Sequence, residues 1–155
     1  MPQLVKGGKH VFGWSEVDHN GRIVVPDEAL TEYGFEGVNK VLVMSGSKRS
    51  GGFALTTPSM LKNSQLSVIL DREPRLAEFR LQEGETVTVG TRKYCWVKLS
   101  SKGEFVVPAE TLKKYGVHLG DRLLVGRGSG LALGFIVKGP IVDEAKRHPD
   151  LELFK

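Results

Sequence analysis

A chain of 155 residues in which 40% are hydrophobic has enough apolar material for one ordinary domain, or for two small ones that interlock. No stretch reaches the roughly 20 apolar residues of a membrane helix, and residues 1–8 lack a signal-peptide core, so we expect a cytoplasmic protein with no membrane partner. The net charge of +4 is too modest to identify a partner by itself.

The first predicted elements are a hairpin and a short helix. A strand over residues 15–17, a tight turn at Asn20-Gly21 and a β-branched run that ends at Pro26 predict the hairpin. The helix follows at once and runs to Tyr33, because proline suits the first helical position and Gly34 supplies a left-handed stop.

A second hairpin is predicted directly after this helix. Its arms are residues 40–44 and 53–56, and its loop is basic and rich in glycine and serine. Residues 9–57 therefore form one short β-rich unit. Such a unit is too small to close a hydrophobic core alone.

The segment 58–90 is predicted to be a partly helical connector. It contains a helical pattern at 59–65, an apolar stretch at 66–70 and a charged piece at 71–83 with helical spacing. We expect it to serve in packing.

The second half of the chain repeats the first. Shifting the sequence by 82 positions superposes residues 91–139 on 9–57 without a gap, and we assign the remaining residues 140–155 to a helical tail. Matched pairs include Trp14 and Trp96, Gly21 and Gly103, Pro26 and Pro108, Tyr33 and Tyr115, and Phe53 and Phe135. Because neither unit suffices alone, we expect the two to fold against each other.

The run Val17-Asp-His-Asn-Gly-Arg-Ile-Val-Val-Pro26, followed by a short helix, Gly34 and an apolar strand at 41–43, resembles the AbrB/MazE/SpoVT swapped-hairpin domain. The second copy, at 99–108, follows the pattern less closely. The resemblance implies a mainly β fold with short helices, in which the two tandem repeats form an AbrB-type barrel as an intrachain pseudo-dimer. It also implies a transcriptional regulator that binds double-stranded DNA.

The tandem arrangement is similar to that of the MraZ family, whose copies each carry an Asp-x-x-x-Arg motif. Asp18 and Arg22 match this motif in the first copy, whereas Ser100 and Glu104 stand at its positions in the second. The AbrB domain also has two arginines in its short helix. Here Lys113 is the only cation at the corresponding positions.

The candidate DNA-contacting residues follow from these motifs and from charge. Residues 91–139 hold nine Lys or Arg against three Asp or Glu, while residues 9–57 hold five against six, so the positive excess belongs to the second half. The predicted DNA-contacting residues are Arg22, Arg92, Lys93, Lys98, Lys102 and Lys113.

Plainer interpretations of the same residues stay open. Arg22 also suits an ion pair with Asp18 that fixes the turn, and the lysines suit an ordinary solvated strand face. At matched positions Glu16 is replaced by Lys98, and Arg22 by Glu104, which favours complementary pairing between the halves.

The residues offer no catalytic, metal or cofactor site. No nucleophile, base and orienting group can be assembled from the sequence, and the histidines lack metal-ligand spacing. Cys95 is predicted to be buried and inert, and the two tryptophans to anchor a core or an interface. The alternatives to a DNA-binding regulator are a protein-interaction module, antitoxin-like or assembly-forming, and a small-ligand sensor. A homo-oligomer also stays open.

Overall fold

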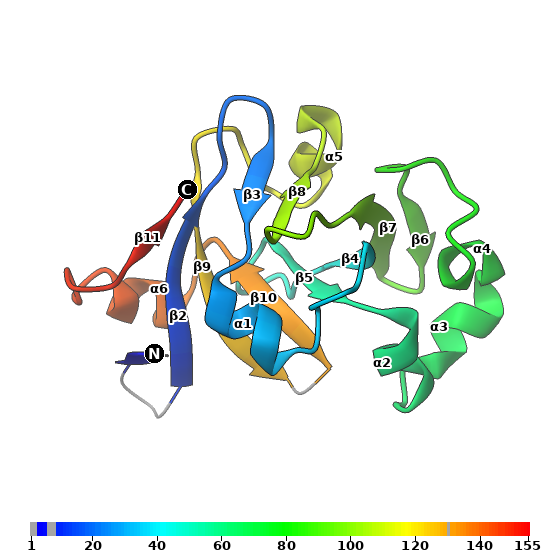
Figure 1. The fold of residues 1–155 in the computed structure, drawn as a ribbon, viewed down its shortest axis with the longest axis horizontal. Helices are drawn as coiled ribbons and strands as arrows, with labels where there is room; N and C mark the ends of the chain where they lie inside the picture. The colour runs from blue at the N-terminus through cyan, green and yellow to red at the C-terminus, as the bar shows by residue number, and fades with distance from the viewer. Residues whose placement is uncertain (1–2, 6–8, 130) are drawn as a thin grey trace.

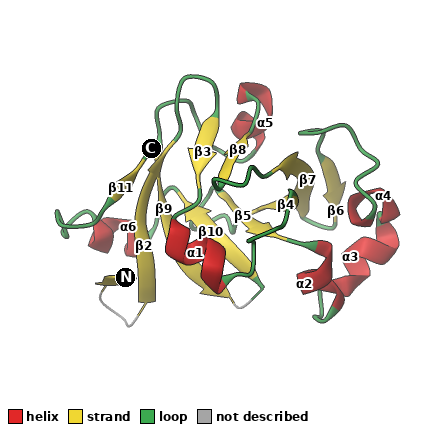
Figure 2. Cartoon of the chain, in the orientation of Figure 1, coloured by secondary structure: helices red, strands yellow, loops and turns green. Residues whose placement is uncertain are grey.

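The computed structural model describes residues 3–5, 9–129 and 131–155 and gives a mainly β chain with short helices (Figures 1 and 2). The strands are β1 (Gln3–Val5), β2 (Lys9–Glu16), β3 (Arg22–Val24), β4 (Lys40–Ser45), β5 (Phe53–Thr56), β6 (Val87–Val89), β7 (Arg92–Lys98), β8 (Glu104–Val106), β9 (Arg122–Ser129), β10 (Ala132–Ile136) and β11 (Leu153–Phe154). The helices are α1 (Asp27–Glu32), α2 (Pro58–Lys62), α3 (Ser67–Arg72), α4 (Pro74–Ala77), α5 (Ala109–Lys114) and α6 (Pro140–Ala145). None of these helices is long and apolar enough to cross a membrane.

The main sheet is open. Its strand order is β1-β2-β9-β10-β5-β4-β7-β6, with β11 also paired to β2, and a separate ribbon joins β3 to β8. The expectation of a barrel is therefore wrong for the described residues, because the strand order has two free ends. Strands from outside the repeats occupy the outer edges of β2 and β7, so these two strands do not meet.

The two halves of the chain exchange strands, while the second predicted hairpin of each half, β4–β5 and β9–β10, pairs within its own half. β2 of the first half pairs with β9 of the second, and β7 of the second half pairs with β4 of the first. The registers match across the repeat: Trp14 lies opposite Leu124, and its equivalent Trp96 lies opposite Leu42. Each of these partners is 82 residues from its counterpart, so the halves are related by an approximate two-fold axis, as expected for units that fold against each other.

The first predicted hairpin forms its turn but not its ladder. The Asp18 N–H donates to the Arg22 carbonyl at 3.1 Å across the turn. Beyond it the arms separate, since β2 pairs with β9 and β3 pairs with β8. The Ser15 side chain links them instead, because its hydroxyl donates to the Val24 carbonyl at 2.8 Å. A turn signal is local, whereas the partner of each arm is chosen by burial between the halves.

The short helices end as predicted. After α1, the N–H of Gly34 donates to Thr31 and that of Phe35 to Leu30, at 3.2 and 2.9 Å, while Gly34 has a φ of 67°. This is the pattern of a Schellman stop, in which glycine adopts the left-handed conformation at low cost. Gly116 ends α5 in the same way, with a φ of 75°.

The connector and the tail each add a strand that sequence reasoning did not predict. α2, α3 and α4 gather beside β6 and β7, whereas α6 lies at the other end of the sheet (Figure 2). After α4 the connector contributes β6 to the sheet edge. The tail forms α6 as predicted and then ends in β11, parallel to β2.

The main core lies where the halves meet, and a second core lies under the connector. Ile23 and Phe105 from the ribbon and Phe53 and Phe135 from the sheet are buried in the main core. In the second, Trp96 is buried and its indole N–H donates to the Leu81 carbonyl at 2.6 Å. Its predicted role as a core anchor is confirmed.

Candidate nucleic-acid interface

The β3–β8 ribbon places Arg22 beside Glu104. Ile23 and Phe105 lie opposite each other and are buried, so their neighbours in each strand face outward. On this outer face the Arg22 Nη2 atom lies 2.5 Å from the Glu104 Oε2 atom, and both side chains are about one-third exposed. The pairing raises the pKa of Arg22 and lowers that of Glu104, chiefly through their shared hydrogen bond. The predicted complementarity between these two positions is confirmed.

Asp18 fixes the turn mainly through the backbone. Its Oδ1 atom accepts the N–H groups of Asn20 and Arg22 at 2.8 and 2.9 Å, whereas its other oxygen is 3.9 Å from the Arg22 guanidinium. The hydrogen bond from the Arg22 N–H is the largest cause of the lowered pKa of Asp18. In the second copy the Ser100 hydroxyl accepts the N–H of Glu104 at 3.0 Å, so the turn keeps its acceptor without the charge.

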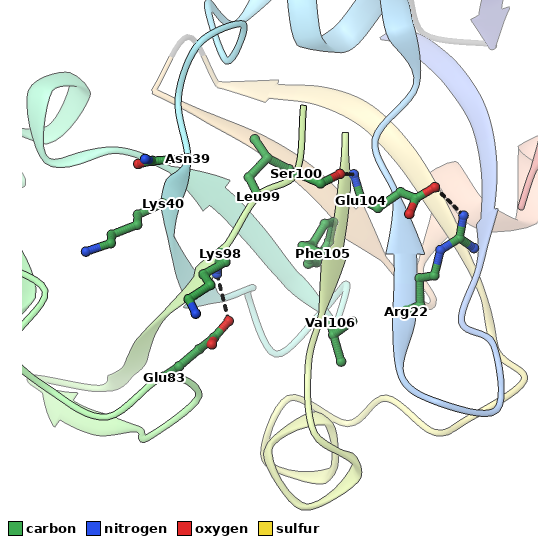
Figure 3. Close-up of a pocket in the computed structure, with 10 residues that line it drawn as sticks. All are labelled: Arg22, Asn39, Lys40, Glu83, Lys98, Leu99, Ser100, Glu104, Phe105 and Val106. Carbon is green, nitrogen blue, oxygen red and sulfur yellow. Dashed lines mark hydrogen bonds and ion pairs between the residues drawn. The ribbon is translucent and has the colours of Figure 1, made fainter. Parts of the chain in front are cut away.

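A groove runs from the ribbon to the adjoining ends of β4 and β7 and has a volume of about 620 Å³ (Figure 3). We call it the ribbon groove. Its lining includes the charged residues Arg22, Lys40, Glu83, Lys98 and Glu104. Val106 lies between the side of the groove that holds Lys98 and the side that holds Arg22 (Figure 3). The structure thus brings two of the predicted DNA-contacting residues, Arg22 and Lys98, into one depression. Three cations face two carboxylates there, and Glu104 is occupied by Arg22.

Lys40 and Lys98 lie directly opposite each other in β4 and β7. Cross-strand partners project to the same side of a sheet, so both lysines leave the same face. The Lys40 Nζ atom lies 5.4 Å from the ring centre of Phe79 and 5.2 Å from that of Trp96, within the range of cation–π attraction. The Glu83 carboxylate accepts the backbone N–H of Lys98 at 2.8 Å.

The equivalent positions in the other half carry opposite charges. Glu16 and Arg122 are register partners in β2 and β9, and the carboxylate is 3.4 Å from the guanidinium. The Lys155 ammonium lies 3.9 Å from the same carboxylate. Glu16 thus pairs with cations at its own end of the sheet and not with Lys98. The predicted contact between Glu16 and Lys98 is therefore wrong.

The predicted basic stretch at the start of β7 does not form one face with Lys98. Arg92 and Lys93 are neighbours in a strand, so their side chains leave on opposite sides. Arg92 shares the side of Lys98, but six residues of strand place them about 20 Å apart. Between them Tyr94 and Trp96 are buried beneath the connector.

The remaining two predicted residues are exposed and lie outside the groove lining. Lys102 stands in the turn between β7 and β8, where its charge contributes to the lowered pKa of Glu104. Lys113 lies on α5, with its ammonium 3.8 Å from the Glu110 carboxylate. Both remain available to a large anionic partner that covers more than the groove.

Sequence reasoning missed Lys40. The signal was present in the repeat, since Lys40 matches Arg122 and each copy therefore opens this strand with a cation. What the sequence could not show is that the facing residue is acidic in one half and basic in the other.

Cys95 is buried as predicted. Burial raises the pKa of its thiol to about 11, and its sulfur lies 3.4 Å from the Tyr115 hydroxyl oxygen. Among the described residues, no group of three His, Cys, Asp or Glu side chains is placed to hold a metal ion. Comparisons with protein-family models, with curated proteins and with solved structures find no match to this chain.

Proposed function

We propose that this protein is a non-enzymatic regulator of the AbrB/SpoVT type that binds double-stranded DNA, with its two repeats acting as an intrachain swapped-hairpin pseudo-dimer. The observation that carries the proposal is the ribbon groove, where Arg22, Lys40 and Lys98 from both halves line one depression. The motif around Asp18 and Arg22 supports it from the sequence side. A second chain is not needed to complete the core, since each half supplies the partner of the other.

Contact with DNA would divide between phosphates and bases. The exposed Lys98 and Lys102 are suited to phosphates, which give affinity and salt dependence without sequence preference. Arg22 is suited to a base edge or a phosphate at the centre of the ribbon, provided that its guanidinium leaves Glu104 or shares it. Glu104 then weakens binding and helps to set which sites are accepted.

The second candidate is a protein-interaction module, and the Arg22–Glu104 ion pair is the observation that favours it. An arginine whose charge is already balanced offers little to a phosphate. In addition, α1 has Asp27 and Glu28 in its first turn, and Leu30 and Thr31 stand where the AbrB domain has arginines. Such a surface suits a basic protein partner.

A fluorescence-anisotropy titration with mixed-sequence duplex DNA, repeated across salt concentrations, tests the proposal. We expect binding at low salt and a linear fall of log affinity with log salt. A single-stranded oligonucleotide of the same composition and a neutral crowding polymer serve as controls. Absence of duplex binding at low salt by protein with native circular dichroism would reject DNA binding and favour the protein-interaction module.

A further inference from the structure

The strongest charge asymmetry between the halves lies where the start of β4 pairs with the end of β7. The Glu16–Arg122 pair of β2 and β9 is neutral and in contact, whereas its equivalent in β7 and β4 is Lys98 opposite Lys40. Like charges directly opposite each other in a sheet are destabilising. Within the described residues, neither ammonium has a carboxylate at ion-pair distance, so no ion pair relieves this cost, and only Lys40 has an aromatic partner.

We propose that Lys40 and Lys98 form an anion site that holds one phosphate group. The proposal rests in part on the proposed function, because a DNA backbone would supply that phosphate; a free phosphorylated small molecule carries the same chemistry. A phosphate between the two ammonium groups would accept hydrogen bonds from both and remove their repulsion. The Glu16–Arg122 end differs, since the Glu16 carboxylate already contacts both cations there, Arg122 and Lys155.

The surroundings hold the Lys40 ammonium at this place. Phe79 has a φ of 52°, which a residue with a side chain adopts only at a cost, and its ring packs edge-on against Trp96 with 5.8 Å between centres. The two rings together face the Lys40 ammonium at 5.4 and 5.2 Å. One lysine is therefore positioned in advance, while Lys98 is exposed and free to close on an anion.

The opposing charge in the site is Glu83. Its carboxylate accepts the Lys98 backbone N–H at 2.8 Å and lines the same groove. With one carboxylate against two ammonium groups, the site keeps a net positive charge. Arg22 and Glu104 at the far side of the groove balance each other and leave that charge unchanged.

Two arms of one experiment compare the wild-type chain with two double variants. K40Q/K98Q alters the site, and E16Q/R122Q is the matched variant at the equivalent positions of the other half. In the first arm, inorganic phosphate is added against chloride at equal ionic strength, and the melting temperature and the Trp96 indole resonance are followed. Wild type and E16Q/R122Q should show a phosphate-specific rise in melting temperature and a shifted indole signal. K40Q/K98Q should show neither.

In the second arm, duplex DNA is titrated across salt concentrations. K40Q/K98Q should lower the slope of log affinity against log salt by about two, while E16Q/R122Q leaves it unchanged. A K40R/K98R variant, which keeps both charges, should behave as wild type and shows that lost charge is responsible.

The arms separate the sources of the phosphate. A phosphate response by protein that binds no DNA supports the site, assigns it to a free phosphorylated ligand and rejects only the proposed function. A change in the DNA slope without a free-phosphate response supports the site and assigns it to the DNA backbone. If K40Q/K98Q responds as wild type does in both arms, the anion site is rejected.

Discussion

Phe53 and Phe135, which are equivalent residues of the two repeats, lie directly opposite each other in β5 and β10 with their rings stacked 5.2 Å apart. Phe105 meets both rings edge-on, at 6.1 Å from Phe53 and 5.6 Å from Phe135. The approximate two-fold axis therefore passes through an aromatic cluster to which both halves contribute. Neither half can bury its own phenylalanine without the other.

Truncation at this axis should destabilise the whole chain. We expect F53A and F135A each to lower the free energy of unfolding by about 3–5 kcal/mol, because each leaves a large cavity in a buried core. Denaturant unfolding followed by tryptophan fluorescence and by far-ultraviolet circular dichroism measures the change. The two probes should report one transition, and V68A at an exposed position should change stability by less than about 0.5 kcal/mol. Separate transitions for the two halves would contradict the interleaved fold.

Glu104 should act against DNA. In E104Q the Arg22 guanidinium loses its counter-charge, so we expect tighter duplex binding and a slope of log affinity against log salt that is steeper by about one. Anisotropy titrations of wild type and variant measure both quantities. D150N, at an exposed position of the C-terminal tail, is the control for the simple loss of one acid near the surface. Equal gains in the two variants would show that general charge, and not the release of Arg22, is responsible.

The pH dependence of stability should reflect Asp18. Its pKa is lowered in the folded chain, chiefly by the hydrogen bond from the Arg22 N–H, so the folded state favours the charged form. This contribution is complete above the ordinary pKa of 3.8 and is lost as pH falls through the lower folded value. D18N keeps an acceptor oxygen but not the charge, so its stability relative to wild type should improve as pH falls below about 4. Denaturant midpoints between neutral pH and pH 2 give the comparison.

Cys95 should be unreactive in the folded protein. With a pKa of about 11 and full burial, its thiolate is scarce at pH 8, and reagents reach it only when the chain opens. We expect labelling by an aromatic disulfide reagent to be far slower than in denaturant, and to follow the unfolding rate. Y115F removes the hydroxyl that donates to the Val43 carbonyl at 3.1 Å, so it should accelerate labelling. Rapid reaction of the native wild type would show that this core is open.

Local signals were predictable from the sequence, and the choice of strand partners was not. The turn at Gly21 and the helix stop at Gly34 depend on backbone conformation that neighbouring residues dictate. The arms on either side of the first turn pair elsewhere because burial across the two halves decides their partners. β11 has only two residues, too few for a periodic pattern, and it forms because β2 offers an edge.

Comparing the two repeats predicted only part of the candidate site. It singled out Arg22 and Glu104, which the fold brings into contact. It also grouped Arg92 and Lys93 with Lys98 by charge alone, although the alternation of a strand places Arg92 and Lys93 on opposite faces. Lys40 was passed over since its charge gains meaning only from the lysine opposite it.

The two ends of β7 should differ in their contribution to DNA binding. If the ribbon side of the molecule contacts DNA, neutralising Lys98 and Lys102 together should lower the slope of log affinity against log salt by about two. R92Q/K93Q also removes two positive charges, but from the opposite end of β7, where the two side chains leave on opposite faces. This variant should leave the slope nearly unchanged. The two double variants have the same net charge as each other, so their long-range attraction to DNA is matched and only the position of the lost charges differs. Equal flattening by the two would mean that DNA is attracted by overall charge alone, and that the ribbon groove is not the contact surface.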